Sequence, residues 1–312
     1  MYSKSRILKG IKNPRHAISV FTSDSIHNIN RGFSRNIIDR IRKPTNIFEE
    51  DWDNLLILDG CTNDLIQQYS FDYELNDTRW SAGSHTVEFM RQNLAKTVQD
   101  DIVWITANPQ VSKFENKIFK VIHAWDRIWN DNLGTVLPED MYDLTIEVAN
   151  QYPNKRLIVH FIQPHYPFIG EFGRSELPSH ASFTVDGYIE DDRNTKRIWK
   201  QLQEGNVSEE VVRKAYRENL EIALPYVRRL TDDLIGKTIL TADHGNEFGK
   251  RAIPIPIRLF GHPEGYRTEN LTCVPWIEFT YEDRKRIVSG DIGNSDVDKS
   301  EIESRLQHLG YK

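Results

Sequence analysis

Residues 54–59 read NLLILD, a short apolar run that ends in a carboxylate, and this stretch sets the interpretation of the whole chain. A run of this length and composition predicts a strand that is buried on both faces. Four further runs predict strands: residues 101–107 (DIVWITA), 156–162 (RLIVHFI), 237–242 (KTILTA) and 272–279 (TCVPWIEF). Helices are predicted between and after them: residues 61–69, 113–129, 139–151, 209–234 (kinked or split by Pro225) and 298–309. This alternation predicts an α/β fold with a mostly parallel central sheet and helices on both faces.

The composition excludes several classes of protein. The chain has 312 residues, of which 38% are hydrophobic and 28% charged, and a net charge of −6. These values are typical of a globular protein, and the mild acidity argues against a nucleic-acid-binding protein. No apolar run reaches the roughly 18 residues of a membrane-spanning helix. Two cysteines, Cys61 and Cys273, are too few for a disulfide framework. With no apolar signal-like segment near the first residue, we expect a cytoplasmic location.

Residues 1–45 differ from the rest in charge and form a basic N-terminal extension, with residues 46–312 as the catalytic domain. The extension carries ten Lys and Arg residues against two Asp. Its apolar residues Ile29, Phe33, Ile37, Ile38 and Ile41 have helical spacing and precede Pro44. One interpretation of residues 28–43 is a peripheral contact with an anionic membrane surface. The other, which we favour because globular helices often carry such a stripe, is packing on the acidic domain.

Polar residues follow the predicted strands, where ligands bind in open parallel sheets. Asp59 follows residues 54–58, His165 follows residues 156–162, and Asp243 and His244 follow residues 237–242. Carboxylates and imidazoles are suitable ligands for one divalent ion such as Zn²⁺, Mn²⁺ or Mg²⁺. Singly, each residue has a simpler explanation, such as helix capping by Asp59. Their convergence at one edge favours a metal site.

A hydroxyl nucleophile is available in residues 80–90, WSAGSHTVEFM, which contain Ser81, Ser84 and Thr86. The segment is small and polar and then becomes helical, so backbone N–H groups and the positive end of the helix dipole would lie beside the hydroxyl. Such a helix start suits a phosphate or sulfate group. Simple capping by Ser84 or Thr86 is the alternative.

Four segments together resemble the alkaline phosphatase superfamily. They are ILDG (57–60), the Ser/Thr turn that opens a helix, PHYPF (164–168) and TADHGNEFG (241–249). The sulfatase-like branch, which includes lipoteichoic acid synthases and phosphoethanolamine transferases, is the most similar. The resemblance covers roughly residues 52–310, including SRLQHLGY at 304–311.

The resemblance implies specific roles. Asp59 matches the first metal-binding aspartate, and Asp243 and His244 match the later metal-binding pair. Thr86 matches the nucleophile, which also binds the metal and takes the phosphoryl or sulfuryl group covalently. His165 matches the histidine that contacts the transferred group. His262, in FGHPEG (260–265), matches a late histidine that binds a metal or the substrate.

Departures from the family pattern refine this expectation. The Cys/Ser-x-Pro-x-Arg motif of sulfatases is absent, which favours phosphate over sulfate esters. His160 and His165 have no Asp between them, which favours one metal ion over two. The spacing from Asp59 to Thr86 is short for the family and leaves Ser84 as an alternative nucleophile.

The expected function is therefore a metal-dependent hydrolase or transferase that acts on phosphate esters, and less readily sulfate esters, through a covalent Thr intermediate. The expected substrate is a small molecule, a glycan or a lipid-linked ester. The alternative is a non-catalytic, sulfatase-like binding partner in a glycan assembly complex, docked through its basic helix. A cofactor-independent mutase is a weaker alternative, because the chain has little room for a second domain.

Overall fold

A seven-stranded mixed sheet forms the centre of the fold in the computed structural model, which describes residues 14–177, 198–291 and 305–306. The strand order is β2-β11-β8-β1-β7-β3-β4. The strands are β1 (Asn54–Leu58), β2 (Leu75–Trp80), β3 (Gln99–Thr106), β4 (Ile118–His123), β7 (Arg156–Phe161), β8 (Thr238–Thr241) and β11 (Cys273–Glu278). Neighbouring strands from β8 to β4 pair in parallel, whereas β11 is antiparallel to both β8 and β2. The predicted α/β class with a mostly parallel sheet is confirmed.

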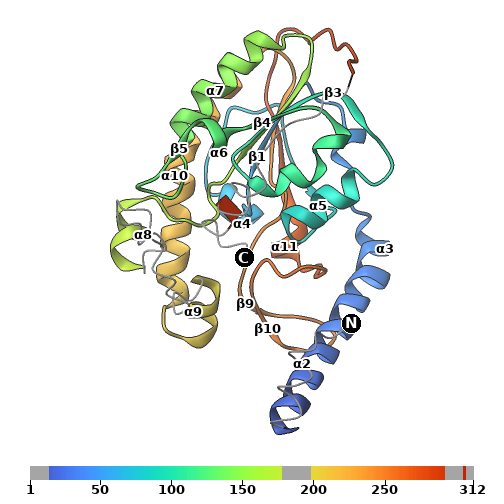
Figure 1. The fold of residues 1–312 in the computed structure, drawn as a ribbon, viewed down its shortest axis with the longest axis vertical. Helices are drawn as coiled ribbons and strands as arrows, with labels where there is room; N and C mark the ends of the chain where they lie inside the picture. Colours follow the sequence, from blue (N-terminus) through green and yellow to red (C-terminus); the bar gives the residue numbers. More distant parts are fainter. Residues whose placement is uncertain (1–13, 178–197, 292–304, 307–312) are drawn as a thin grey trace.

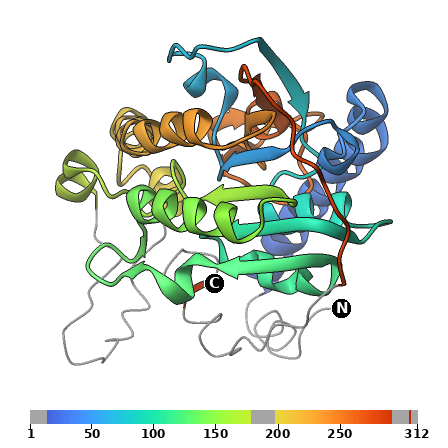
Figure 2. The same cartoon turned by 90° about the horizontal axis from the view of Figure 1, so that it is seen from above.

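Helices cover both faces of the sheet (Figures 1 and 2). The long helices are α2 (Pro14–Phe33), α5 (Thr86–Asn93), α7 (Pro138–Gln151) and α10 (Glu209–Asp233). The shorter ones are η1 (Ser34–Ile38), α3 (Asp39–Arg42), η2 (Ile47–Glu49), α4 (Asn63–Ile66), η3 (Pro109–Lys117), α6 (Ala124–Arg127), α8 (Glu171–Glu176), α9 (Ile198–Glu204) and α11 (Glu269–Thr272). Two small hairpins complete the described elements: β5 (Trp129–Asn130) with β6 (Thr135–Val136), and β9 (Glu247–Arg251) with β10 (Arg258–Gly261).

Strand β1 shows why an unbroken apolar run marks the sheet centre. Leu56 and Leu58 belong to the core that α7 and α10 cover. Leu55 and Ile57 point to the opposite face, into the core that includes residues of α5. Because successive side chains alternate between faces, a strand covered on both sides needs apolar residues at every position.

Most predicted elements are present, and the differences have physical causes. The helix predicted over residues 113–129 is wrong, because η3, β4 and α6 occupy this segment and β4 pairs with β3. Pairing across the sheet thus outweighs local helix propensity. Strand β2, whose residues are mostly exposed, was not predicted. Pro225 lies inside α10 without splitting it. Of the helix predicted over residues 298–309, all but residues 305–306 lie outside the described residues.

Candidate functional site

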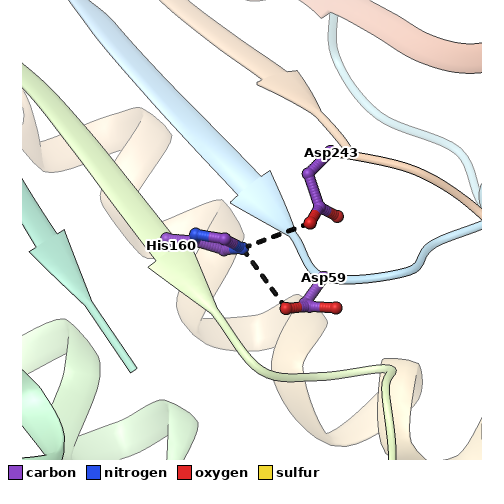
Figure 3. A group of neighbouring side chains, drawn as sticks. All are labelled: Asp59, His160 and Asp243. Carbon is purple, nitrogen blue, oxygen red and sulfur yellow. Dashed lines mark ion pairs between the residues drawn. The ribbon is translucent and has the colours of Figure 1, made fainter. Parts of the chain in front are cut away.

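Two carboxylates and one imidazole meet at the carboxyl edge of the sheet (Figure 3). Asp59 follows β1, Asp243 follows β8, and His160 lies on β7, which pairs with β1 on the side opposite β8. Their ligand atoms all lie within 4.8 Å of one another. The His160 Nε2 atom is 3.4 Å from Asp59 Oδ2 and 3.9 Å from Asp243 Oδ2. All three side chains are fully buried, and this donor set suits a divalent ion such as Zn²⁺ or Mn²⁺.

Thr86 and His244 adjoin the same carboxylates. Thr86 is the first residue of α5, and its hydroxyl donates to Asp243 Oδ2 at 2.8 Å. The His244 Nε2 atom lies 3.4 Å from Asp243 Oδ2, 3.7 Å from Asp59 Oδ1 and 3.5 Å from Thr86 Oγ1. The structure thus brings together the four residues expected at the metal. Asp59 and Thr86 come more than 150 residues before Asp243 and His244 in the chain.

The buried carboxylate of Asp59 is kept ionised by its surroundings. Burial alone would raise its pKa, but its hydrogen bond with His160 and its electrostatic interactions with the neighbouring imidazoles outweigh burial and lower the pKa below its ordinary value. Asp59 is therefore an anion at neutral pH. An anionic carboxylate surrounded by imidazoles is the state that binds a cation.

A glycine turn after β1 positions Asp59 against Asp243. Gly60 has a φ of +63°, and its N–H donates to Asp243 Oδ1 at 3.0 Å. The Gly60 carbonyl accepts hydrogen bonds from Asn246 Nδ2 at 2.8 Å and from the Tyr216 hydroxyl. A side chain at this position would meet the Asn246 amide, with Cβ 2.8 Å from Nδ2. Only glycine combines this backbone conformation with such close packing.

Three histidine rings lie next to one another beside this group. The ring centroid of His262 is 5.0 Å from that of His165 and 4.7 Å from that of His244. The Nδ1 atom of His262 is 3.0 Å from Asn246 Oδ1, so we assign a proton to Nδ1. Burial lowers the pKa of both His165 and His262, so both rings are neutral at neutral pH. Neutral imidazoles can donate one hydrogen bond to a substrate oxygen or can ligate a metal.

The alternative nucleophile Ser84 is engaged elsewhere. Its Oγ atom lies 2.9 Å from both Glu88 Oε2 and Pro263 O, and it accepts from Gly265 N at 2.9 Å. These partners form a separate buried cluster, in which Arg267 Nη2 is 3.0 Å from Glu88 Oε1. Ser84 therefore stabilises the turn before α5 and the segment that carries His262.

Sequence reasoning missed two residues of the site, Asn108 and His160. The Asn108 amide donates to Asp59 Oδ2 and, at 3.2 Å, to Thr86 Oγ1. Asn108 follows the end of β3, so the rule that placed His165 could also have found it. His160 lies inside an apolar strand, where the usual explanation of a histidine is core packing. Its alignment with Ile57 across the sheet is the signal, and this register is visible only in the structure.

Comparisons with known proteins find similar structures only. No family model matches the sequence, and no curated protein matches it. The zinc complex of the C-terminal periplasmic domain of EcEptC from Escherichia coli has 14% identity and a TM-score of 0.46, over 76% of this chain and 75% of that chain. The C-terminal periplasmic domain of the phosphoethanolamine transferase EptC from Campylobacter jejuni has 16% identity and a TM-score of 0.43, over 72% of this chain and 78% of that chain. The lipoteichoic acid synthase LtaP from Listeria monocytogenes has 10% identity and a TM-score of 0.36, over 89% of this chain and 78% of that chain.

The resemblance drawn from the motifs pointed to phosphoethanolamine transferases and lipoteichoic acid synthases, and a structure of each kind is among those matched. At identities of 10–16% and TM-scores below 0.5, the likeness carries no argument about chemistry, which must come from the site itself.

The cytoplasmic location expected from the sequence is contradicted, because the matched EptC structures are periplasmic domains. That expectation came from missing features, namely a signal-like segment and a cysteine framework, and such absences do not identify a compartment. Among the described residues, no helix is both long enough and apolar enough to cross a bilayer.

Proposed function

We propose that this protein is a metal-dependent enzyme that transfers or hydrolyses phosphate esters through a covalent intermediate on Thr86. One observation carries the proposal: the Thr86 hydroxyl, at the first position of α5, lies 2.8 Å from Asp243 within a buried Asp–His–Asp group. A structural threonine in a core needs one hydrogen-bond partner. This one also lies 3.2 Å from Asn108 Nδ2 and 3.5 Å from His244 Nε2, which suits a reacting group better.

The donor set supports a resident divalent ion. Asp59, Asp243 and His244 would hold it together with Thr86 Oγ1, and His160 is close enough to take part. All of these side chains are fully or almost fully buried, and a dehydrated pair of carboxylates is costly without a compensating cation. When bound, the ion supplies a positive charge that lowers the pKa of the hydroxyl and offsets charge on the transferred group.

The protein's own residues would divide the remaining work. The Thr86 oxygen forms the new bond to phosphorus while the bond to the leaving alkoxide breaks. The Asp243 carboxylate accepts the hydrogen bond of the Thr86 hydroxyl and so directs its proton away from the attacking lone pair. The Asn108 amide donates to Asp59 and Thr86 and holds both side chains in place. Backbone N–H groups at the start of α5 would face oxygens of the phosphoryl group.

The two buried histidines are suited to the leaving group. His165 and His262 lie beside His244 and are neutral at neutral pH, so each has one ring nitrogen that can take up a proton. One of them takes up the proton that the Thr86 hydroxyl loses as its oxygen bonds to phosphorus, and gives that proton to the departing alkoxide. In the second step, water or an acceptor hydroxyl attacks the phosphothreonine, its proton passes to the same imidazole and then to the Thr86 oxygen as the Thr86–phosphorus bond breaks, and Thr86 is regenerated.

We further propose that the substrate is a glycan or lipid-linked phosphate ester rather than a sulfate ester. The support is the absence of the Cys/Ser-x-Pro-x-Arg sulfatase motif, together with a hydroxyl rather than a thiol at the start of α5. The assay below tests which metal supports the reaction.

The test measures the release of nitrophenol from its phosphate monoester, phosphate diester and sulfate, in the presence of Mn²⁺, Zn²⁺ or Mg²⁺. The proteins compared are wild type, Thr86→Ala, Thr86→Ser and Ser84→Ala. We expect metal-dependent release from a phosphate ester, lost at least about 1,000-fold in Thr86→Ala and retained in part by Thr86→Ser. Peptide mass spectrometry of quenched reactions should find phosphate on Thr86. Wild-type activity in Thr86→Ala would overturn the assignment of the nucleophile. Silence of folded, metal-loaded protein across the panel, with phosphate esters still binding, would favour the non-catalytic binding protein.

A further inference from the structure

The N-terminal helical stretch (residues 24–43, in α2, η1 and α3) exposes its apolar side to solvent. Ile29, Ile37 and Ile41 are 52%, 44% and 73% exposed. Phe33, half-buried, completes a row with a residue every four positions. On an ordinary surface helix this row would face the core, and the polar residues would face water.

The polar side of the same stretch packs on the protein. Asn30 is fully buried, and its amide donates to Ile255 O at 2.9 Å and accepts from Ile255 N at 2.9 Å. Asp39 accepts from Arg267 Nε at 2.7 Å, and the Arg42 guanidinium lies 4.1 Å from the Trp80 ring centroid. These contacts fix the rotation of the helix. The outward position of the isoleucines is therefore a consequence of how the helix docks and not of a loose helix.

The charges on the outer side are basic. Arg40 and Lys43 are exposed beside the isoleucine row. Arg35, in contrast, pairs inward with Glu88 at 3.5 Å. Of the two acidic residues of this stretch, Asp24 and Asp39, Asp39 is paired inward with Arg267. Residues 1–45 as a whole carry ten Lys and Arg residues against two Asp. An exposed apolar row flanked by cations is complementary to an anionic lipid surface, where the isoleucines enter the acyl boundary and the cations meet the headgroups.

We propose that the face made by Ile29, Phe33, Ile37 and Ile41, with Arg40 and Lys43, docks on an anionic membrane surface. The helix lies flat on the bilayer and does not cross it. This inference goes beyond the proposed function and does not depend on it, because it rests on residues outside the metal site.

The docking would also orient the site. On its inner side the helix holds the segment that follows His262: the His27 Nδ1 atom is 2.5 Å from the Tyr266 hydroxyl, and Arg267 bonds to Asp39. A surface bound to the outer side would thus lie one helix diameter, about 10 Å, from the segment that carries His262.

The experiment is co-sedimentation of the full chain with vesicles of phosphatidylcholine containing roughly one third phosphatidylglycerol, and with vesicles of phosphatidylcholine alone. The variants are Ile37→Glu/Ile41→Glu on the face, Arg40→Glu/Lys43→Glu beside it, and Ile235→Glu as a matched control. Ile235 is 69% exposed and lies after α10, away from the helix. Circular dichroism and the urea midpoint establish that each variant is folded, and because all five residues are exposed we expect unchanged values.

We expect wild type and Ile235→Glu to bind the anionic vesicles and to bind phosphatidylcholine at least about tenfold more weakly. Ile37→Glu/Ile41→Glu should lose at least about tenfold in vesicle binding. Arg40→Glu/Lys43→Glu should lose the preference for the anionic lipid. Absence of wild-type binding, or equal loss in the Ile235→Glu control, overturns the proposal. Self-association of wild type in analytical ultracentrifugation that the face variant abolishes, without vesicle binding, overturns it in favour of a second copy of the chain.

Discussion

Replacing Glu88 by Gln tests the buried cluster that holds α5 against the segment after His262. The Glu88 side chain is fully buried. Its Oε2 accepts from Ser84 N at 3.0 Å, Gly265 N at 3.1 Å and Arg267 Nη1 at 3.2 Å. Its Oε1 accepts from Arg267 Nη2 at 3.0 Å. A glutamine retains one acceptor oxygen, but its NH₂ group would face donors, and the Arg267 charge, whose side chain is 3% exposed, would keep only Asp39 as a partner.

Two arguments give the size of the effect. Burial alone would raise the pKa of Glu88, but the hydrogen bonds and charge of Arg267, with the hydrogen bonds of Ser84, hold it at about 2 against an ordinary 4.5. At about 1.4 kcal/mol per pKa unit, this depression corresponds to roughly 3 kcal/mol of stability. Removing one partner of a buried ion pair costs about 3–5 kcal/mol, and Asp39 moderates the loss. We therefore expect Glu88→Gln to lose about 3 kcal/mol at pH 7.

The pH dependence gives the sharper test. A carboxyl whose folded pKa is depressed stabilises the fold above its unfolded pKa, and this contribution is lost as pH falls from 4.5 towards 2. The difference in unfolding free energy between wild type and Glu88→Gln, from urea titrations followed by tryptophan fluorescence, should therefore shrink across this window. Glu264→Gln is the control, because Glu264 is 40% exposed and pairs with Arg91 on the surface, so its loss should stay below about 1 kcal/mol. A Glu88→Gln loss under about 1 kcal/mol at pH 7, or one that is constant down to pH 2, would refute the reasoning.

Three further predictions concern residues outside the reaction. Gly83→Ala should destabilise the fold by more than about 2 kcal/mol in urea unfolding, because a Cβ there would collide with the Phe89 backbone. Gly32→Ala, at an open helical position of α2, should instead stabilise the fold by about 0.5–1 kcal/mol. Equal effects of the two substitutions would contradict this reasoning. Tyr216→Phe should lower the free energy of unfolding by about 1–3 kcal/mol and weaken metal binding in calorimetry. The reason is that the Tyr216 hydroxyl accepts from Thr62 N and donates to Gly60 O, on the two sides of the turn after β1. Unchanged metal affinity would argue against a positioning role for Tyr216. Burial raises the pKa of both thiols, but Cys61 is fully buried whereas Cys273 is partly exposed, so native protein should react with a disulfide reagent at Cys273 and not at Cys61 until unfolded. Labelling of native Cys61 would contradict the packing.

The sequence predicted the sheet centre well because burial on both faces leaves an unambiguous apolar run. Leu55 to Leu58 could only be a covered strand or a short core helix, and the Asp–Gly that follows favoured the strand. The same logic could not find β2, whose polar residues Asn76 to Thr78 are exposed at the sheet edge and become a strand only by pairing with β11. The prediction for residues 118–123 was wrong for the opposite reason. These residues have enough apolar side chains for a helix or a strand, and only pairing with β3 decides for the strand.

The site was predictable where it depends on strand ends and not where it depends on register. Asp59, Asp243 and His244 follow strands and so could be placed at one edge. Thr86 could be placed only as a helix start, because its distance to Asp243 depends on how α5 docks. His160 faces the carboxylates because β7 pairs with β1 in one register, and a shift by one residue would turn it to the other face.

The site and the N-terminal helix meet in one buried cluster, which makes the two proposals physically related although separately testable. Glu88 comes two residues after Thr86, and Arg267 comes five residues after His262. Arg267 bonds Glu88 on one side and Asp39 of α3 on the other, so it connects the nucleophile's helix, the segment after His262 and the helix with the exposed isoleucine row. A buried cation with two anionic partners resists small displacements, because separating either pair leaves a charge unpaired in a medium of low dielectric constant. A membrane bound to the isoleucine row would therefore hold the site at a fixed height and orientation above the lipid. Vesicles should accordingly accelerate turnover of lipid-linked esters and leave turnover of nitrophenyl esters unchanged, and Glu88→Gln should reduce that acceleration.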